Sequence, residues 1–156
     1  MPALALTKAR AVVGTGVRGV VLAADTVVAV DENLLGKPRD ADDARRMLHL
    51  LHNRAHEVVT GVAVVDAATG RVATTAVVTV VVMGDYDDDA LEAYVATGAP
   101  LDKAGGYAIQ EIPESWLQAV VGPYSNVVGL PLAATRRLLA SFGVPLLASP
   151  FRTKES

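Results

Sequence analysis

The sequence contains no cysteine. This absence excludes disulfide bonds, zinc sites built from cysteine ligands and a catalytic thiol. A chain without cysteine is compatible with a reducing compartment, and we expect a cytoplasmic location. The first residues, Met1–Leu4, also lack the basic-then-apolar order of a secretory signal.

Long apolar runs and basic stripes are missing too. The longest apolar stretch, 76–83, is far too short to span a bilayer, and its valine content predicts a buried strand instead. The formal net charge is −3. We therefore expect neither a nucleic-acid polymer nor an anionic membrane as a partner. A single nucleotide is compatible with this charge, because a few local cations can bind phosphate in an acidic protein.

What is present is the composition of a folded globule, with 51% hydrophobic and 20% charged residues. Hydrophobic patterning predicts one α/β domain over residues 1–146, followed by a polar tail at 147–156. Valine and threonine on both sides of 67–70 predict a long β-hairpin. The expected helices are 3–13, 41–51 with Asp40 as its cap, 87–97 and 131–142, and the expected strands are 20–30, 56–66, 71–83, 104–110 and 117–121.

The glycine-rich stretch 14–19 (GTGVRG) matches a dinucleotide-binding pattern letter for letter. That pattern requires a strand before it and a helix after it. Here the expected helix precedes the glycines and the expected strand follows them. We therefore interpret the stretch as a plain turn.

Two metal-binding patterns are incomplete. His49, His52 and His56 would share a helix face only if the helix continued through all three, and no carboxylate completes a zinc pattern. We interpret them as surface and helix-end residues. The acidic series at 85–89 resembles a calcium loop but is followed by alanine where the loop needs glycine. It predicts an acidic helix start instead.

Asp25 lies inside the apolar stretch 20–30. A carboxylate among valines and alanines costs several kcal/mol to desolvate unless a charged or hydrogen-bonding group meets it. Thr26 points to the opposite face of the strand, so the pair is expected at an edge between core and cleft. Two interpretations stay open: a functional carboxylate, or an aspartate at the strand's end that caps a turn.

Two lysines lie in conformationally restricted loops. Lys37 stands between a glycine and a proline, and Lys103 precedes the small residues Ala104, Gly105 and Gly106. A solvated lysine is the default interpretation of each. Together with Asp25, they predict an anion-binding site.

Taken in chain order, these segments resemble the Maf family of septum-formation-inhibitor-like nucleotide pyrophosphatases. The likeness extends from about Leu4 to Gly143, in the family's order and at its approximate spacing. The matching stretches are AADTVV at 23–28, LGKPRD at 35–40, HEVVTG at 56–61, LDKAGGYAIQ at 101–110 and YSNVVGLP at 124–131.

The resemblance implies an α/β fold of the Maf/ITPase-like kind: a mixed, elongated sheet flanked by helices, with two lobes around a cleft, often as a homodimer. It also implies hydrolysis of a nucleoside triphosphate at the α–β phosphoanhydride, giving a monophosphate and pyrophosphate, with Mg²⁺ or Mn²⁺ as cofactor. A house-cleaning role and a link to cell-division or septum control come with the family.

The resemblance also implies roles for single residues. Asp25 matches the family's proton acceptor and would also contact the metal, while Asp102 would hold metal or orient Lys103. The two loop lysines match phosphate-binding positions. Threonine after the catalytic aspartate is the pattern of members that prefer dTTP and UTP. The matched positions are Asp25, Thr26, Lys37, Asp102, Lys103 and Gln110.

One family segment, a Ser-x-Ser-Pro-Arg-Arg phosphate loop, is not in this sequence, and three hypotheses stay open. The leading one is a nucleotide pyrophosphatase whose full form begins upstream of Met1. The second is a catalytically impaired Maf-like remnant that acts as a nucleotide-binding or regulatory module. The third is a related house-cleaning enzyme for deaminated purines, which would prefer ITP or XTP.

Overall fold

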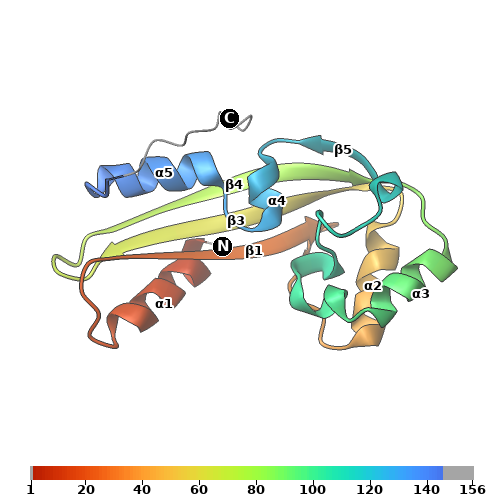
Figure 1. Ribbon diagram of the computed structural model, residues 1–156, viewed down its shortest axis with the longest axis horizontal. Helices are drawn as coiled ribbons and strands as arrows, with labels where there is room; N and C mark the ends of the chain where they lie inside the picture. Colours follow the sequence, from red (N-terminus) through yellow and green to blue (C-terminus); the bar gives the residue numbers. More distant parts are fainter. Residues whose placement is uncertain (1, 146–156) are drawn as a thin grey trace. The chain divides into compact units, whose positions relative to one another are not determined.

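The computed structural model describes residues 2–145. They form a five-stranded sheet in the order β2-β1-β3-β4-β5, with helices on either side (Figure 1). The α/β class and the helix-flanked sheet are therefore confirmed, but the sheet is antiparallel and not mixed as expected. The predicted tail at 147–156 lies outside the described residues. The elements are α1 Pro2–Val13, β1 Val20–Val30, β2 Asn33–Leu35, α2 Ala41–Leu51, β3 Ala55–Asp66, β4 Val72–Met83, α3 Asp88–Ala96, β5 Leu117–Val121, α4 Tyr124–Val128 and α5 Leu132–Ser141, with short 3-10 helices η1 Ala99–Asp102, η2 Ala104–Gly106 and η3 Glu114–Trp116.

Neighbouring strands pair antiparallel wherever a tight turn joins them. The β1–β2 pair closes around the turn 31–32. The strands β4 and β5 are also antiparallel, although α3 and the 3-10 helices lie between them in the chain. The predicted hairpin of β3 and β4 is confirmed: its turn is closed by the Asp66 amide, which donates to the Arg71 carbonyl at 2.9 Å. A short turn can join only antiparallel strands, because parallel strands need a long crossover.

The described chain groups into two compact units, each drawn from several stretches of sequence. Unit 1 comprises residues 2–25, 60–77 and 123–145, and unit 2 comprises 26–59 and 78–122. Both units contain parts of the long strands β1, β3 and β4. In the described residues, every helix falls short of the length and hydrophobicity that crossing a membrane requires.

In unit 1, α1 packs on the sheet through alanines. Ala5 and Ala9 are fully buried against Ala63 and Val65 of β3. Their spacing of four places both on one helix face, and their small side chains let the helix axis approach the strands closely. This close approach brings the helix's polar residues near β1.

The C-terminal helices of unit 1 are tied to the hairpin by polar contacts. The Thr60 hydroxyl donates to the Asn126 carbonyl at 3.2 Å, and the Asn126 side-chain amide donates to the Val77 carbonyl at 2.9 Å. At the far end of the hairpin, the Arg71 guanidinium donates to the Ser141 carbonyl and lies 4.4 Å from the centre of the Phe142 ring. Such contacts fix α4 and α5 to the strands.

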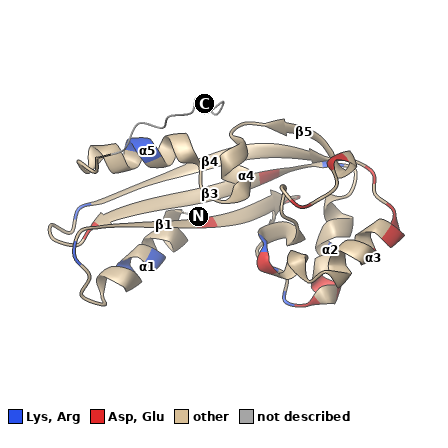
Figure 2. Cartoon of the chain, viewed as in Figure 1, with Lys and Arg blue, Asp and Glu red and all other residues tan. Residues whose placement is uncertain are grey.

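In unit 2, the two helices α2 and α3 lie side by side (Figure 1). Their buried faces carry Leu48, Leu51 and Leu91, each at most 1% exposed. Figure 2 shows acidic residues gathered at the N-terminal ends of both helices, where Asp40 and Asp87 act as caps. The predicted cap at Asp40 and the acidic start of the second helix are thus confirmed, since carboxylates accept from the free amides of a first helical turn.

The expected strand at 104–110 is wrong. This segment, here called the glycine–tyrosine segment and defined as residues 103–110, forms one short 3-10 helix, η2, and then an irregular stretch that ends in a turn. Gly105 and Gly106 have φ of 75° and 82°, a left-handed conformation that regular strand pairing excludes. Two short elements, β2 and α4, were not expected, because three to five residues are too few to show a period.

Candidate functional site

Asp25 lies in unit 1, in the middle of β1, with five strand residues after it. A position in mid-strand excludes the interpretation of Asp25 as a turn cap at the strand's end. Its side chain is 17% exposed, and one carboxylate oxygen lies 2.6 Å from the Lys8 ammonium. The charged partner that a desolvated carboxylate requires is therefore present.

Lys8 was missed as a site residue, since the sequence placed it only on the polar side of the first helix. It lies 17 positions from Asp25, and no local period links a helix residue to a strand residue at that distance. The alanine pair Ala5 and Ala9 could have indicated this contact, because it predicts close packing of α1 on the sheet. A long side chain next to that face can then reach a strand carboxylate.

We expect Lys8→Met to lower the free energy of unfolding by about 1 kcal/mol or less, because the lysine is 56% exposed and solvent screens the pair. Urea unfolding of the variant measures this loss. The double variant Lys8→Met with Asp25→Asn should recover most of it, because no carboxylate is then left without its partner. Additive losses in the double variant would contradict the pairing.

Lys37 and the start of the glycine–tyrosine segment lie together in unit 2. The Lys37 ammonium is 3.8 Å from a carboxylate oxygen of Asp102, and both side chains are well exposed. The Gly105 amide donates to the Gly36 carbonyl at 3.1 Å, which joins the two loops through their backbones. Asp102 therefore forms an ion pair with Lys37. The resemblance instead predicts that Asp102 holds metal or orients Lys103.

The remaining predicted residues are also in unit 2. Thr26 follows Asp25 on β1 and is half-buried, while Gln110 is exposed in the turn that ends the glycine–tyrosine segment. Lys103, at the other end of that segment, is half-buried. The structure therefore brings the lysine-bearing loops together and places Lys103 and Gln110 at the two ends of one buried segment.

No three histidine, aspartate or glutamate side chains gather into a metal-ligand cluster within residues 2–145. A magnesium ion that binds a nucleotide needs no such cluster, since it is commonly held by one or two carboxylates together with substrate phosphates. The carboxylates of Asp25 and Asp102 have the chemistry that Mg²⁺ and Mn²⁺ prefer. Both residues predicted as metal ligands therefore carry a suitable ligand group.

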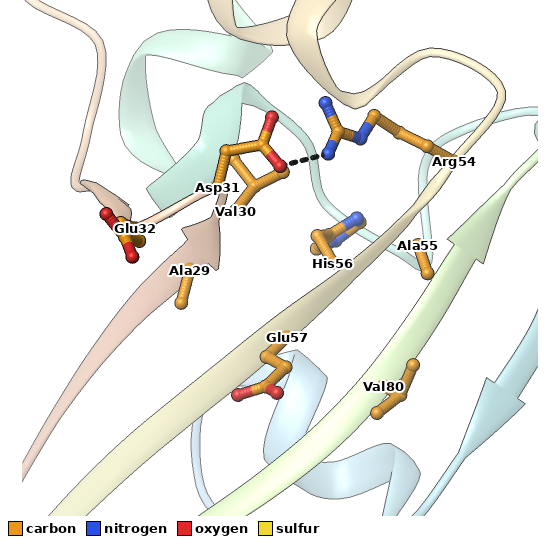
Figure 3. A pocket seen from close by; sticks show the side chains of 9 residues that line it. All are labelled: Ala29, Val30, Asp31, Glu32, Arg54, Ala55, His56, Glu57 and Val80. Atoms are coloured by element: carbon orange, nitrogen blue, oxygen red, sulfur yellow. Dashed lines mark hydrogen bonds and ion pairs between the residues drawn. The ribbon is translucent and has the colours of Figure 1, made fainter.

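A pocket of about 400 Å³ lies in unit 2 where β1 ends and β3 begins (Figure 3). Three of its lining residues are acidic, and the Arg54 guanidinium donates to the Asp31 carboxylate at 2.5 Å. None of the predicted site residues lines this pocket. Because three carboxylates face one already paired cation, the pocket repels a triphosphate, and we do not assign the nucleotide to it.

His56, on the wall of that pocket, is only 3% exposed. Its Nε2 atom lies 2.6 Å from the Tyr107 hydroxyl oxygen. Burial, and secondarily the nearby Arg54 charge, lower the pKa of His56 to about 4. As the sequence indicated, His56 lies in a strand and apart from the helix that carries His49. Its interpretation as a surface or helix-end residue is wrong, because the strand β3 places its side chain in the interior.

The lowered pKa of His56 predicts acid-sensitive stability. Between pH 6.5 and pH 4 the unfolded chain binds a proton that the folded chain does not, so the free energy of unfolding falls as the pH falls through this window. The total loss from this group is on the order of 3 kcal/mol. Urea unfolding at pH 7 and at pH 4.5 should show a shallower pH dependence for His56→Gln than for the wild type. His49→Gln, which removes an exposed histidine, should keep the wild-type slope; equal slopes in all three proteins would contradict the assignment.

These features define a class: an α/β protein that presents lysines on glycine-rich loops and a lysine-paired carboxylate in a strand, a chemistry suited to phosphate groups. Comparison with known families narrows the class. A family model described as Maf-like protein matches residues 1–142. The chain therefore belongs to the Maf family, as its motifs indicated.

Individual relatives are similar over most of the chain. The dTTP/UTP pyrophosphatase of Salinibacter ruber is 49% identical over 94% of this chain and 72% of its own length. The dTTP/UTP pyrophosphatase of Anaeromyxobacter dehalogenans is 51% identical over 92% of the chain and 73% of its own length. The enzyme of the same name from Moorella thermoacetica is 49% identical over 91% of the chain and 73% of its own length.

Proposed function

We propose that this chain is a nucleoside triphosphate pyrophosphatase that acts on dTTP and UTP, with a house-cleaning role in nucleotide metabolism. The observation that carries the proposal is the sequence identity to relatives named dTTP/UTP pyrophosphatase. This identity is 49–51% over more than nine tenths of the chain. The presence of Thr26 directly after Asp25 supports the pyrimidine preference.

Asp25 acts in this proposal as the proton acceptor. Water attacks the α-phosphorus and loses a proton to the Asp25 carboxylate, while the bond from the α-phosphorus to the bridging oxygen breaks and pyrophosphate leaves with that bond's electron pair. Lys8, 2.6 Å from that carboxylate, places a positive charge beside it. A divalent metal ion, for which Asp25 and Asp102 are the proposed ligands, would neutralise charge on the phosphate oxygens when bound.

The phosphates are bound in this proposal by the loop lysines. Lys37 and Lys103 carry flexible, charged donors, and Lys37 lies on a loop that is hydrogen-bonded to the glycine–tyrosine segment. Gln110 and Thr26 take part in the choice of base. Binding through fixed charges stabilises the growing negative charge of the leaving pyrophosphate.

We expect Lys37→Ala and Lys103→Ala each to lower kcat/KM for dTTP by about tenfold to a hundredfold, as the loss of one charged hydrogen bond does. Steady-state kinetics with pyrophosphate detection measures the change. Arg136→Ala is the matched control, because it removes an exposed cation from α5. A loss in the control equal to that in the lysine variants would mean that net charge alone, and no specific contact, explains the effect.

Pyrophosphate release from a nucleotide panel tests the function itself. The panel comprises dTTP, UTP, CTP, ITP, XTP and 7-methyl-GTP, each with Mg²⁺ or Mn²⁺. We expect the highest kcat/KM with dTTP and UTP. Preference for ITP or XTP would favour the enzyme for deaminated purines. No release from any nucleotide by the folded protein would favour the catalytically impaired, nucleotide-binding module.

The assembly and location belong to the same proposal. We propose a homodimer in the cytoplasm, with neither a nucleic-acid polymer nor a membrane as partner, and a link to septum control through nucleotide metabolism. Sedimentation equilibrium measures the mass of the assembly against the 16.2 kDa chain. A mass equal to one chain across the accessible concentration range would contradict the dimer.

A further inference from the structure

The glycine–tyrosine segment is buried in its middle and accessible at its ends. Its five central residues are all buried, whereas Gln110 is exposed and Lys103 is half-buried. Apart from one short 3-10 turn, no helix or strand ladder supports it. Its position in unit 2 therefore depends on packing against α2 together with a few specific hydrogen bonds.

Two tyrosine hydroxyl groups supply hydrogen bonds to this segment. The Tyr107 hydroxyl lies 2.6 Å from Nε2 of His56, with the two rings edge to face at a centroid distance of 5.5 Å. The backbone amide of Ala108 donates to the hydroxyl oxygen of Tyr94 at 3.1 Å. Tyr94 in turn packs edge to face on Trp116.

The contact between His56 and Tyr107 is a directional hydrogen bond, unlike the apolar packing around it. Both residues are at most 5% exposed, so neither side chain is available to touch a nucleotide. A phenylalanine at position 107 would fill nearly the same volume, because only the hydroxyl is lost. What the hydroxyl adds is a restraint that joins the middle of the segment to the strand β3.

We propose that His56 and Tyr107 are positioning residues: their hydrogen bond holds the glycine–tyrosine segment on β3, so that Lys103 and Gln110 are fixed at its ends. The inference rests on the proposed function for the roles of these two end residues. The Gly105 amide, which donates to the Gly36 carbonyl, extends the same restraint to the loop of Lys37. One buried bond thus orders three side chains proposed to bind the nucleotide.

Tyr107→Phe tests the proposal, and Tyr86→Phe is its matched control. The Tyr86 hydroxyl is also buried, but it donates its hydrogen bond to the Leu48 carbonyl of α2 and not to a residue of the segment. We expect Tyr107→Phe to lower kcat/KM for dTTP by about tenfold to a hundredfold, mainly through KM, as misplaced binding groups do. Tyr86→Phe should change kcat/KM by about twofold or less. Equal effects of the two substitutions would overturn the proposal, because both remove one buried hydroxyl.

A double-variant cycle tests the partnership itself. His56→Leu combined with Tyr107→Phe should be no more impaired than the worse single variant, because the bond is already lost in each. His56→Gln, which keeps a side chain able to hydrogen-bond, should recover part of the activity. Additive losses would overturn the pairing. If His56→Leu does not fold, the comparison of Tyr107→Phe with Tyr86→Phe decides.

A readout without turnover separates this inference from the proposed function. Amide hydrogen exchange at Gly105 and Ala108 should be about tenfold faster in Tyr107→Phe than in the wild type, and unchanged in Tyr86→Phe. Calorimetry should show weaker binding of dTMP to Tyr107→Phe than to the wild type, and unchanged binding to Tyr86→Phe. A wild-type protein that releases no pyrophosphate refutes the proposed function alone; unchanged exchange and unchanged dTMP binding in Tyr107→Phe refute the positioning role.

Discussion

Asp25→Asn is expected to lower kcat for pyrophosphate release from dTTP by about a hundredfold to ten-thousandfold, the usual contribution of a general base. Asparagine keeps the shape of the side chain but cannot accept the proton of the attacking water. Because the substituted group stays hydrogen-bonding and nearly isosteric, the fold should persist. Stopped-time pyrophosphate assays at saturating dTTP measure the change, with urea unfolding as the check on stability.

Glu57→Gln is the matched control for this substitution. Glu57 is a carboxylate on the strand β3, and it is exposed. Its neutralisation removes the same charge from the protein as Asp25→Asn does, and it should leave kcat within about twofold. Full activity of Asp25→Asn, with the variant properly folded, would remove Asp25 from the role of proton acceptor.

Gly105→Ala is expected to lower the free energy of unfolding by about 2 to 4 kcal/mol. An added Cβ atom would lie 2.7 Å from Cγ2 of Val28, which is itself only 1% exposed and has no room to withdraw. The residue also has a φ of 75°, which costs a side chain about 1 kcal/mol or more. Urea unfolding at neutral pH measures the sum.

Gly106→Ala separates the two causes. Its φ is similar, at 82°, but the nearest atom to an added Cβ is Cγ of Pro38 at 3.6 Å, an ordinary contact distance. Only the backbone cost should remain, about 1 kcal/mol. The difference between the two variants then measures the steric overlap with Val28. Equal losses in both would show that this overlap is relieved by relaxation of the core.

Helices, hairpin and the mid-chain strands could be predicted because their signals are local. Asp40 and Asp87 as caps, and the valine-rich runs on both sides of 67–70, act through neighbouring backbone groups and alternating faces. The segment 104–110 was mispredicted as a strand for a physical reason. Apolar and small residues suit a buried turn as well as a strand, and only the φ angles of its glycines distinguish the two.

The sequence by itself determined that Asp25 lies in a strand, that two lysines lie in restricted loops, and that these residues follow one another in the order of the Maf family. It could not determine their partners. The contacts of Asp25 with Lys8, of Lys37 with Asp102 and of His56 with Tyr107 join residues 17, 65 and 51 positions apart. Contacts at such separations depend on how α1 packs on β1 and how the glycine–tyrosine segment packs on β3. Packing of that kind is a property of the whole fold, so only the tertiary structure decided which side chains meet.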